Sequence, residues 1–368
     1  MVSKDIDLPP TNHKKIMGKL LWSYLFVFVL LFVAASCTKK EENASTNVSG
    51  ETELWLVPPG KVLFKDLPKD RIPSIDDPQF IPADQSNLKP DDLVLVARIA
   101  GETRIYPVRM MDAHEIVNDN LNDQYFAITY CPRTGSGMKW NRKINGKVTE
   151  FGVSGMLYNE NLMPYDRETE SIWSQMKTQC VHGKLMGSFP ETSILLETRF
   201  STIKAAFPDA KVLDHTDCES GSCGIPKHGG FLKDEPVDED TVNLPSGQQY
   251  FGVVKNSRLL LFNFKLFNEG VQLFTTNFQG ASLIICGSNE LHLFTAFLKN
   301  TSAGNYSYTA VQGKLPVIMK DNFGNLYDIF GEIVQGPEKG KRLEPTLAYF
   351  SRTFAWELFF NDIELYRE

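Results

Sequence analysis

The feature of the sequence that most restricts its fold is an internal repeat, with an offset close to 155 residues. The stretch 126–131 (FAITYC) aligns with 282–286 (SLIIC), and in each copy an aspartate follows the cysteine by 35 residues, at Asp166 and Asp321. An ordered series of matches at a near-constant offset is typical of duplication. We therefore expect two related lobes, residues 93–213 and a degenerate second lobe, residues 247–368.

The local patterns predict the fold class of these lobes. Residues 148–154 and 306–311 alternate in polarity and are rich in β-branched and aromatic side chains, which is typical of strands. Helical patterns are few and do not alternate regularly with strands. The sequence therefore predicts an α+β architecture that is mainly antiparallel β. Residues 53–92, rich in Pro and Asp, are expected to form an extended segment over the first lobe; we call it the leading segment.

The N-terminus has the pattern of an export signal. Residues 20–35 are apolar apart from Ser23, lysines precede them, and small residues lead directly to Cys37. This run is short for a membrane-spanning helix. The ending resembles a lipobox, so we expect residues 1–36 to be a lipoprotein signal peptide and Cys37 to be acylated. The alternative is an uncleaved membrane anchor with an incidental cysteine.

The residues after Cys37 predict where the protein resides. Residues 37–52 are polar and without apolar periodicity, as expected of a flexible tether. Thr38 is not the aspartate of an inner-membrane retention signal, which favours the outer membrane within the cell envelope. The net charge of −7 and the lack of a dense basic patch argue against nucleic acid as a partner. The expected partners are a membrane, through the lipid anchor, and an unknown small ligand.

The first copy carries polar residues that the second has lost, which predicts a site in the first lobe. At the constant offset the replacements are Thr169 by Gly324, Ser171 by Leu326, Trp173 by Asp328 and Gln175 by Phe330.

Four segments of the first lobe carry a family resemblance. They are residues 114–119 (HEIVND), 129–135 (TYCPRTG), 151–159 (FGVSGMLYN) and 165–175 (YDRETESIWSQ). Together they resemble the bacterial domain-of-unknown-function family 3179, strongly over residues 90–215 and more distantly over 246–362. The resemblance implies an extracytoplasmic location and no particular reaction. Members commonly have a second cysteine where this chain has Thr134, which argues against a dithiol role here.

Cys131 is the main candidate for chemistry, with His114 and Glu115 beside it. At a strand end before a glycine-containing loop, backbone N–H groups are expected to lower its thiol pKa. Imidazole and thiolate suit a copper or zinc ion, although two soft ligands are fewer than a closed metal site needs. His114 could instead be the base for a nucleophilic Cys131. The alternative interpretation is a small, buried, structural cysteine.

A ligand pocket is expected around Cys131, lined by Tyr158, Asp166 and Trp173. Asp166 has a second interpretation as a turn residue that accepts backbone N–H bonds, favoured by its retention as Asp321. Trp173 has a second interpretation as a core side chain.

The insert between the copies, residues 214–246, is rich in glycine, cysteine and histidine. A Cys218–Cys223 disulfide is the favoured interpretation in an oxidising compartment, and a zinc clasp with His215 and His228 is the alternative. Five cysteines remain after Cys37, so at least one is unpaired within the chain. We expect Cys131 to be reduced.

Three functions remain open from the sequence. The chain is a binding or metal- and thiol-handling module centred on the first lobe, a cysteine-dependent enzyme acting on a small substrate, or a structural or assembly lipoprotein without chemistry. Phosphate-binding loops, dinucleotide fingerprints and serine-hydrolase elbows are absent from the sequence.

Overall fold

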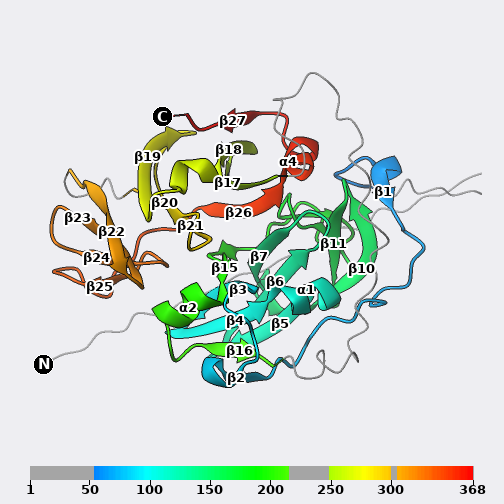
Figure 1. The fold of residues 1–368 in the computed structure, drawn as a ribbon. Helices are drawn as coiled ribbons and strands as arrows, with labels where there is room; N and C mark the ends of the chain where they lie inside the picture. The colour runs from blue at the N-terminus through cyan, green and yellow to red at the C-terminus, as the bar shows by residue number, and fades with distance from the viewer. Residues whose placement is uncertain (1–53, 215–247, 300–304, 368) are drawn as a thin grey trace, which may run out of the picture. The chain divides into compact units, whose positions relative to one another are not determined.

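The computed structural model describes residues 54–214, 248–299 and 305–367. Most of this part of the chain is β-strand, with three α-helices of seven residues each. The strands pair almost everywhere in antiparallel fashion (Figure 1). The predicted α+β, mainly antiparallel fold is confirmed.

The first half, residues 93–213, forms three sheets together with strands of the leading segment. Their orders are β15-β3-β4-β16-β2, β14-β7-β6-β5 and β1-β10-β11-β12-β13. The bounds are β1 Val62–Leu63, β2 Phe80–Pro82, β3 Leu93–Ile99, β4 Glu102–Pro107, β5 Ile116–Leu121, β6 Gln124–Cys131, β7 Ser136–Asn141, β10 Phe151–Tyr158, β11 Asn161–Asp166, β12 Ile172–Ser174, β13 Gln179–His182, β14 Thr192–Ser193, β15 Leu196–Arg199 and β16 Lys211–Leu213. A small hairpin of β8 (Lys143–Ile144) and β9 (Lys147–Val148) and two helices, α1 (Val108–His114) and α2 (Phe200–Ala206), complete it.

The second half, residues 248–367, also forms three sheets. Their orders are β26-β17-β18-β27, β19-β20-β21 and β22-β23-β24-β25. The bounds are β17 Gln249–Lys255, β18 Arg258–Phe262, β19 Gln272–Phe278, β20 Ala281–Ser288, β21 Leu293–Leu298, β22 Tyr308–Lys314, β23 Val317–Asp321, β24 Leu326–Asp328, β25 Ile333–Gln335, β26 Leu347–Arg352 and β27 Ile363–Leu365, with a 3-10 turn at Phe264–Phe267 and helix α4 at Thr353–Phe359.

The two halves have the same order of strands. In each, a hairpin (β3–β4, β17–β18) receives a later antiparallel strand on one side (β15, β26) and a parallel strand on the other (β16, β27). Each half then continues with a three-stranded antiparallel unit, β5–β7 or β19–β21, and a four-stranded one, β10–β13 or β22–β25.

The hairpin turns are also matched between the halves. Both central residues have positive φ in the turns 100–101 and 122–123 of the first half, and in 256–257 and 279–280 of the second. Two positive φ values define the type I′ turn, whose twist matches that of the flanking strands. Equivalent turns therefore fix equivalent registers in the two halves.

The contacts between the halves are reciprocal. Strand β15 of the first half lies against β21 of the second, and β26 of the second lies against β7 of the first. The Ser351 hydroxyl donates to the carbonyl of Thr134 at 3.0 Å, and the Thr198 hydroxyl donates to the carbonyl of Leu291 at 3.0 Å. Thus β26 of the second half supports the tip of the β6–β7 hairpin, and β15 of the first half supports the tip of the β20–β21 hairpin.

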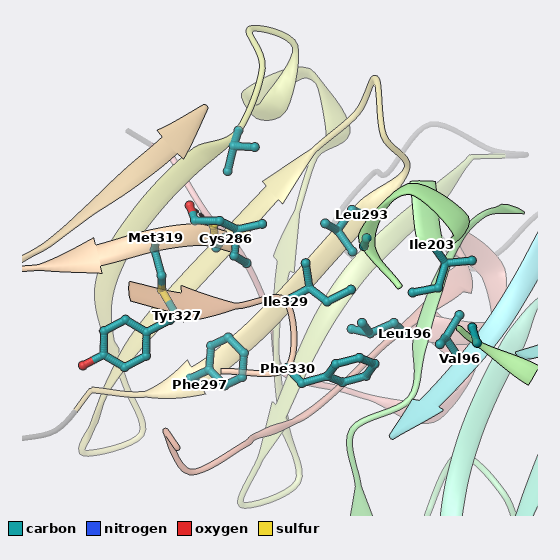
Figure 2. Packing of buried hydrophobic residues seen from close by; sticks show 14 of the residues in the cluster. Val96, Leu196, Ile203, Cys286, Leu293, Phe297, Met319, Tyr327, Ile329 and Phe330 are labelled. Carbon is teal, nitrogen blue, oxygen red and sulfur yellow. Dashed lines mark hydrogen bonds between the residues drawn. The ribbon is translucent and has the colours of Figure 1, made fainter. Parts of the chain in front are cut away.

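A shared hydrophobic core joins the halves (Figure 2). Val96, Leu196 and Ile203 of the first half belong to one buried cluster with Leu293 and Ile329 of the second. Full burial of one such side chain contributes about 1.5–3 kcal/mol. The halves are therefore parts of one folded body, and neither has a complete core alone.

The leading segment runs along the first half. Strand β1 pairs with β10, and β2 pairs with β16. Between them, the amide of Asp70 donates to the carbonyl of Val153, and the amide of Ile75 donates to the carbonyl of Ile116. These bonds occupy edge groups that would otherwise be exposed.

Candidate functional site

The hairpin between β6 and β7 carries the Cys131 thiol. Gly135, with a φ of 62°, closes the loop by donating its amide to the carbonyl of Cys131 at 2.8 Å. Cys131 is 1% exposed, and its sulfur lies 3.7 Å from the carbonyl oxygen of Glu160.

Burial raises the pKa of the Cys131 thiol, and the neighbouring Glu115 carboxyl raises it further. Hydrogen bonds from Thr134 and the backbone lower this pKa by less than burial raises it. The expectation of an activated thiolate is therefore wrong, because desolvation outweighs the backbone N–H groups that prompted it.

Cys131, Cys180 and Cys286 are all free and buried, as predicted for Cys131. Cys37, Cys218 and Cys223, and the tether and insert that contain them, lie outside the described residues.

Glu115 is a second buried ionisable group beside Cys131. It caps the C-terminus of α1 in a left-handed conformation, with a φ of 58°, and is only 7% exposed. Burial raises the pKa of its carboxyl to about 7; Arg133 lowers this pKa and Asp112 raises it, both by smaller amounts. Glu115 therefore exchanges its proton near neutral pH.

Two charged side chains border this position. Arg133, in the β6–β7 hairpin, forms an ion pair with Glu160, in the turn between β10 and β11, and both are partly buried. The ion pair connects the two loops on either side of the Cys131 sulfur. Glu115, Cys131 and Arg133 together make up what we call the Glu115 site.

His114 does not belong to this site. Its Nδ1 is hydrogen-bonded to the carbonyl of Pro73, in the leading segment, at 2.8 Å. Nor do the described residues contain any group of three or more His, Cys, Asp or Glu side chains that could hold a metal ion. The copper or zinc ion expected at Cys131 and His114 stays a prediction, because the bond to Pro73 engages only Nδ1 and leaves Nε2 of the imidazole available.

The expected pocket of Tyr158, Asp166 and Trp173 is not formed either. Asp166 pairs with Phe151 at one end of the β10–β11 hairpin, and Tyr158 pairs with Asn161 at the other. Strand β11 separates these ends by roughly 16 Å, at about 3.3 Å per residue. Tyr158 instead stacks edge-on against Phe359, with ring centroids 5.6 Å apart.

Asp166 stabilises the turn that follows β11. It accepts bonds from the amide of Thr169 at 2.7 Å, from the Thr169 hydroxyl, and from the indole N–H of Trp173 at 3.0 Å. Asp321 has the same surroundings in the second half, where it accepts from the amide of Asn325 at 3.0 Å and the hydroxyl of Tyr327 at 2.6 Å.

A cluster of buried polar side chains lies next to the Glu115 site, and of these side chains only Gln175 was among the residues that predicted a site in the first lobe. It joins β6, β7 and the loop before β7 to the start of β11 and the end of β12, and each member is at most 1% exposed. We call it the polar core: Thr129, Thr134, Ser136, Asn161 and Gln175.

Gln175 is the centre of the polar core. Its amide oxygen accepts from Ser136 at 2.9 Å and from Asn161 at 2.8 Å, and its amide nitrogen donates to the Thr129 hydroxyl at 3.0 Å. The Asn161 amide also donates to the Thr134 hydroxyl at 3.0 Å. Periodicity carries no signal for this cluster, because β6 is buried on both faces from Phe126 to Cys131.

The hairpin registers identify the counterparts of the polar core in the second half. The pairs Cys131–Ser136 and Ser288–Leu293 each close a four-residue loop. In the same way the pairs Tyr158–Asn161 and Lys314–Val317 close equivalent turns. The replacements are Thr129 by Cys286, Ser136 by Leu293, Asn161 by Val317 and Gln175 by Ile329.

This register corrects the expectation that Cys131 and Cys286 occupy equivalent strand ends. Cys131 is the last residue of β6, whereas Cys286 lies two residues before the end of β20. The strands correspond, but the offset is 157 residues here and 155 at the aspartates. A shift of two residues leaves both cysteines on the same face of the sheet.

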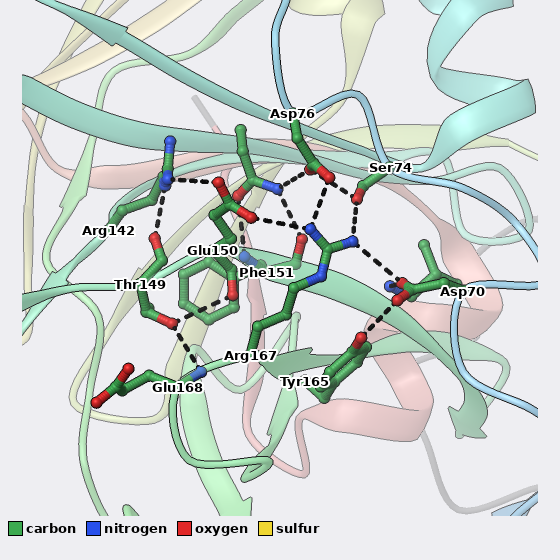
Figure 3. Close-up of polar contacts among 12 residues, drawn as sticks. Asp70, Ser74, Asp76, Arg142, Thr149, Glu150, Phe151, Tyr165, Arg167 and Glu168 are labelled. Atoms are coloured by element: carbon green, nitrogen blue, oxygen red, sulfur yellow. Dashed lines mark hydrogen bonds and ion pairs between the residues drawn. The ribbon is translucent and has the colours of Figure 1, made fainter.

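A second polar cluster, which the sequence analysis missed, binds the leading segment (Figure 3). The Arg167 guanidinium contacts Asp76 at 2.6 Å, Glu150 at 3.0 Å and Asp70 at 3.5 Å. Burial acts to raise the pKa of Asp76, but the bonds from Arg167, Asn118 and Ser74 hold it below its usual value. These contacts fix the leading segment against β10 and β11, and hence fix Pro73 near His114.

Two cavities lie between the halves. One is lined by residues including Leu95, Glu197, Phe294 and Tyr349, and the other by residues around Lys139. Each measures about 10 Å³, which is space for about one water molecule. Neither can hold a small organic ligand, and neither is lined by Glu115, Cys131 or Arg133.

The fold and site define a mainly antiparallel α+β protein with two halves of one strand order, and a buried, titrating carboxyl group in the first. The chain belongs to the family described as protein of unknown function DUF3179, which matches residues 69–363. No curated protein and no solved structure shows significant similarity to it. Within the described residues, no helix is long and apolar enough to cross a membrane.

Proposed function

We propose that this protein is a lipid-anchored component of the bacterial cell envelope that binds a small polar ligand at the Glu115 site. The anchor is an acylated Cys37, supported by the apolar run 20–35, the small residues before the cysteine and the polar tether after it. Thr38 favours the outer membrane. The ligand-binding part of the proposal rests on the geometry around Glu115.

The observation that carries the proposal is a buried carboxyl group with a pKa of about 7. Burying a carboxyl group without a full set of partners is unfavourable, and proteins retain such groups mainly where they act. The left-handed backbone at Glu115 adds local strain, which also concentrates at functional positions.

The neighbours of Glu115 indicate the chemistry of the ligand. Arg133 presents a cation that is partly exposed and shared with Glu160. The Cys131 thiol stays neutral and is a weak hydrogen-bond donor. A small molecule with an anionic group for Arg133 and a hydrogen-bond donor for Glu115 matches this arrangement.

The proposal also includes common descent of the two halves. The matched strand order, the matched type I′ turns and the reciprocal contacts of β15 and β26 support it. On this interpretation, the second half is a copy that kept the fold and lost the polar core, and its remaining role is to support the β6–β7 hairpin.

A thermal-shift experiment tests ligand binding. The full chain in detergent would be melted with small carboxylates, phosphates and amino acids at pH 6 and pH 8. We expect one of these classes to raise the melting temperature of the wild type and not of Glu115→Gln. Glu168→Gln, at an exposed carboxyl, is the control. An equal response of the wild type and Glu115→Gln would reject the site.

Acylation is tested separately. Cys37→Ala should accumulate as an unprocessed precursor without lipid, whereas Cys180→Ala, which removes a buried cysteine, should be processed normally. Unchanged processing of Cys37→Ala, with release from membranes still requiring detergent, would reject the lipoprotein interpretation.

A further inference from the structure

An exposed apolar patch lies where the described chain begins. Leu54 is 72% exposed, Leu56 45%, Leu63 41% and Phe64 53%. These four side chains come from a stretch of eleven residues that ends just after β1. Leu63 lies in β1, which pairs with β10 at one edge of the sheet, whereas Leu56 is hydrogen-bonded to Val181 of β13, at the other edge (Figure 1). We call the four exposed side chains the β1 patch.

The parts of the β1 patch are held together. The backbone of Leu56 donates to Val181 at 2.8 Å, and Leu63 pairs with Leu157. The Lys65 ammonium lies 5.2 Å from the ring of Trp55, which connects the two ends of the stretch. The patch is therefore a fixed surface of the folded protein.

The exposure of the Phe64 side chain goes with an unusual backbone conformation at this residue. Its φ is 60°, a value that bulky side chains rarely adopt. The amide of Leu67 donates to the carbonyl of Phe64 at 3.2 Å and closes the turn. A strained turn thus directs a large aromatic ring to solvent, beside the exposed side chains of Lys61 and Lys65.

The position of the patch along the chain indicates what it contacts. Residues 38–53 separate it from Cys37 and from the apolar run 20–35. If residues 38–53 form the flexible tether that the sequence predicts, their average reach would be about 20–25 Å. A short tether keeps a weak surface at a high effective concentration near its target. The bilayer that holds the N-terminus is therefore always within reach of the patch.

We propose that the β1 patch rests on the lipid bilayer, with Leu54, Leu56, Leu63 and Phe64 in the interfacial layer and the two lysines at the headgroups. Aromatic and aliphatic side chains flanked by lysine are the usual composition of such a surface. The inference rests on the proposed anchoring of the N-terminus. It implies that the folded body has a fixed orientation on the membrane.

Trp55 offers a direct measurement. Of the tryptophans in the described residues, Trp140, Trp173 and Trp356 are fully buried, and Trp55 alone is partly exposed. The difference in fluorescence between the wild type and Trp55→Phe isolates the signal of Trp55. The full chain would be reconstituted into phosphatidylcholine vesicles with 20–30% phosphatidylglycerol, with and without bromine on the acyl chains.

We expect brominated lipid to quench the Trp55 signal by at least half. The triple substitution L54E, L56E and F64E should abolish this quenching while the protein still floats with the vesicles. Phe323→Glu is the matched control, because Phe323 is 48% exposed and lies in the unit β22–β25, on the opposite side of the picture from β1 (Figure 1). It should leave the quenching unchanged.

Three outcomes would overturn the inference, and they are distinguishable. Flotation without quenching of Trp55 would reject the docking and leave the anchoring intact. Loss of flotation would reject the anchoring and the docking with it. Shielding of Trp55 from acrylamide before vesicles are added would show that another segment or a second copy covers the patch. None of these measurements depends on the Glu115 site.

Discussion

The two halves place opposite kinds of side chain between equivalent sheets. In the first half, β6 and β7 contact β11 and the end of β12 through the hydrogen-bonded polar core. In the second half the equivalent strands meet through Cys286, Leu293 and Ile329, in a continuous apolar cluster. One strand order therefore tolerates either kind of interior, so the fold alone does not require the polar core.

The difference between the polar interior of the first half and the apolar interior of the second indicates where a functional site is to be expected. A saturated network of buried hydrogen bonds adds little stability compared with well-packed apolar residues, but it fixes positions strictly. In this protein the network lies directly beside Cys131 and the hairpin that carries Arg133. The first half has a hydrogen-bonded polar support at the place where the second half has only apolar packing.

The largest effect is expected from breaking the polar core at its centre. Gln175→Ile removes the four hydrogen bonds that Gln175 makes with Thr129, Ser136 and Asn161, and should lower the free energy of unfolding by about 4 kcal/mol, at about 1 kcal/mol for each bond. Urea unfolding of the full chain in detergent measures this. Ile329→Val, at the matched position of the second half, should lower it by only about 1 kcal/mol.

A quadruple substitution sharpens the same comparison. T129C, S136L, N161V and Q175I together copy the second half into the first. Because the side-chain partners of Gln175 are removed together with it, although the Thr134 hydroxyl and the Met176 amide each lose a partner, this variant should be more stable than Gln175→Ile alone. A quadruple variant less stable than the single one would show that the two interiors are not interchangeable.

The next effect concerns pH. The folded Glu115 has a pKa of about 7 against an ordinary value of 4.5, so the folded state binds the proton more tightly than the unfolded state. Stability should therefore fall as pH rises from 4.5 to 7, by about 3 kcal/mol, and then level off. Glu115→Gln should remove this slope, and Glu168→Gln should keep it. A slope that persists in Glu115→Gln would refute the assignment.

A smaller loss of stability, of equal size at the two positions, is expected when Asp166 or Asp321 is replaced. Asp166→Ala and Asp321→Ala each remove the acceptor of a turn and of one aromatic donor, and each should lower the free energy of unfolding by about 2 kcal/mol. Similar losses, measured by urea unfolding, would support a shared turn role. A loss of thermal-shift ligand binding in Asp166→Ala at unchanged stability would point instead to direct contact with ligand.

The smallest effect tests the reciprocal contacts. Ser351→Ala and Thr198→Val each remove one hydroxyl that donates to a hairpin carbonyl across the halves, and each should lower stability by about 1 kcal/mol. Only Ser351→Ala should alter the pKa of Glu115, because only it supports the β6–β7 hairpin. An equal pH profile in both variants would remove the link between the second half and the site.

The sequence predicted the fold class, because strand alternation is a local signal. It could not predict which strands pair. Strand β15 pairs with β3 across about 100 residues, for example at Leu196 and Val96, and such pairing depends on the whole chain.

The site was predicted in part. Glu115 and Cys131 were identified from adjacent motifs, but the direction of the His114 ring depends on Pro73, forty-one residues earlier in the chain. Apart from Gln175, the polar core was missed because Ser, Thr and Asn are ordinarily read as turn or surface residues. Their burial becomes visible only when two sheets are placed face to face.

The support of the β6–β7 hairpin by β26 determines when the site is completed during biosynthesis. The carbonyl of Thr134 accepts a hydrogen bond from the hydroxyl of Ser351, which is 217 residues further along the chain, in one of the last strands to be synthesised. A chain that ends before β26 lacks that strand. Such a chain contains the β6–β7 hairpin but not its support from the second half, so the surroundings of Glu115 are complete only once β26 has been synthesised.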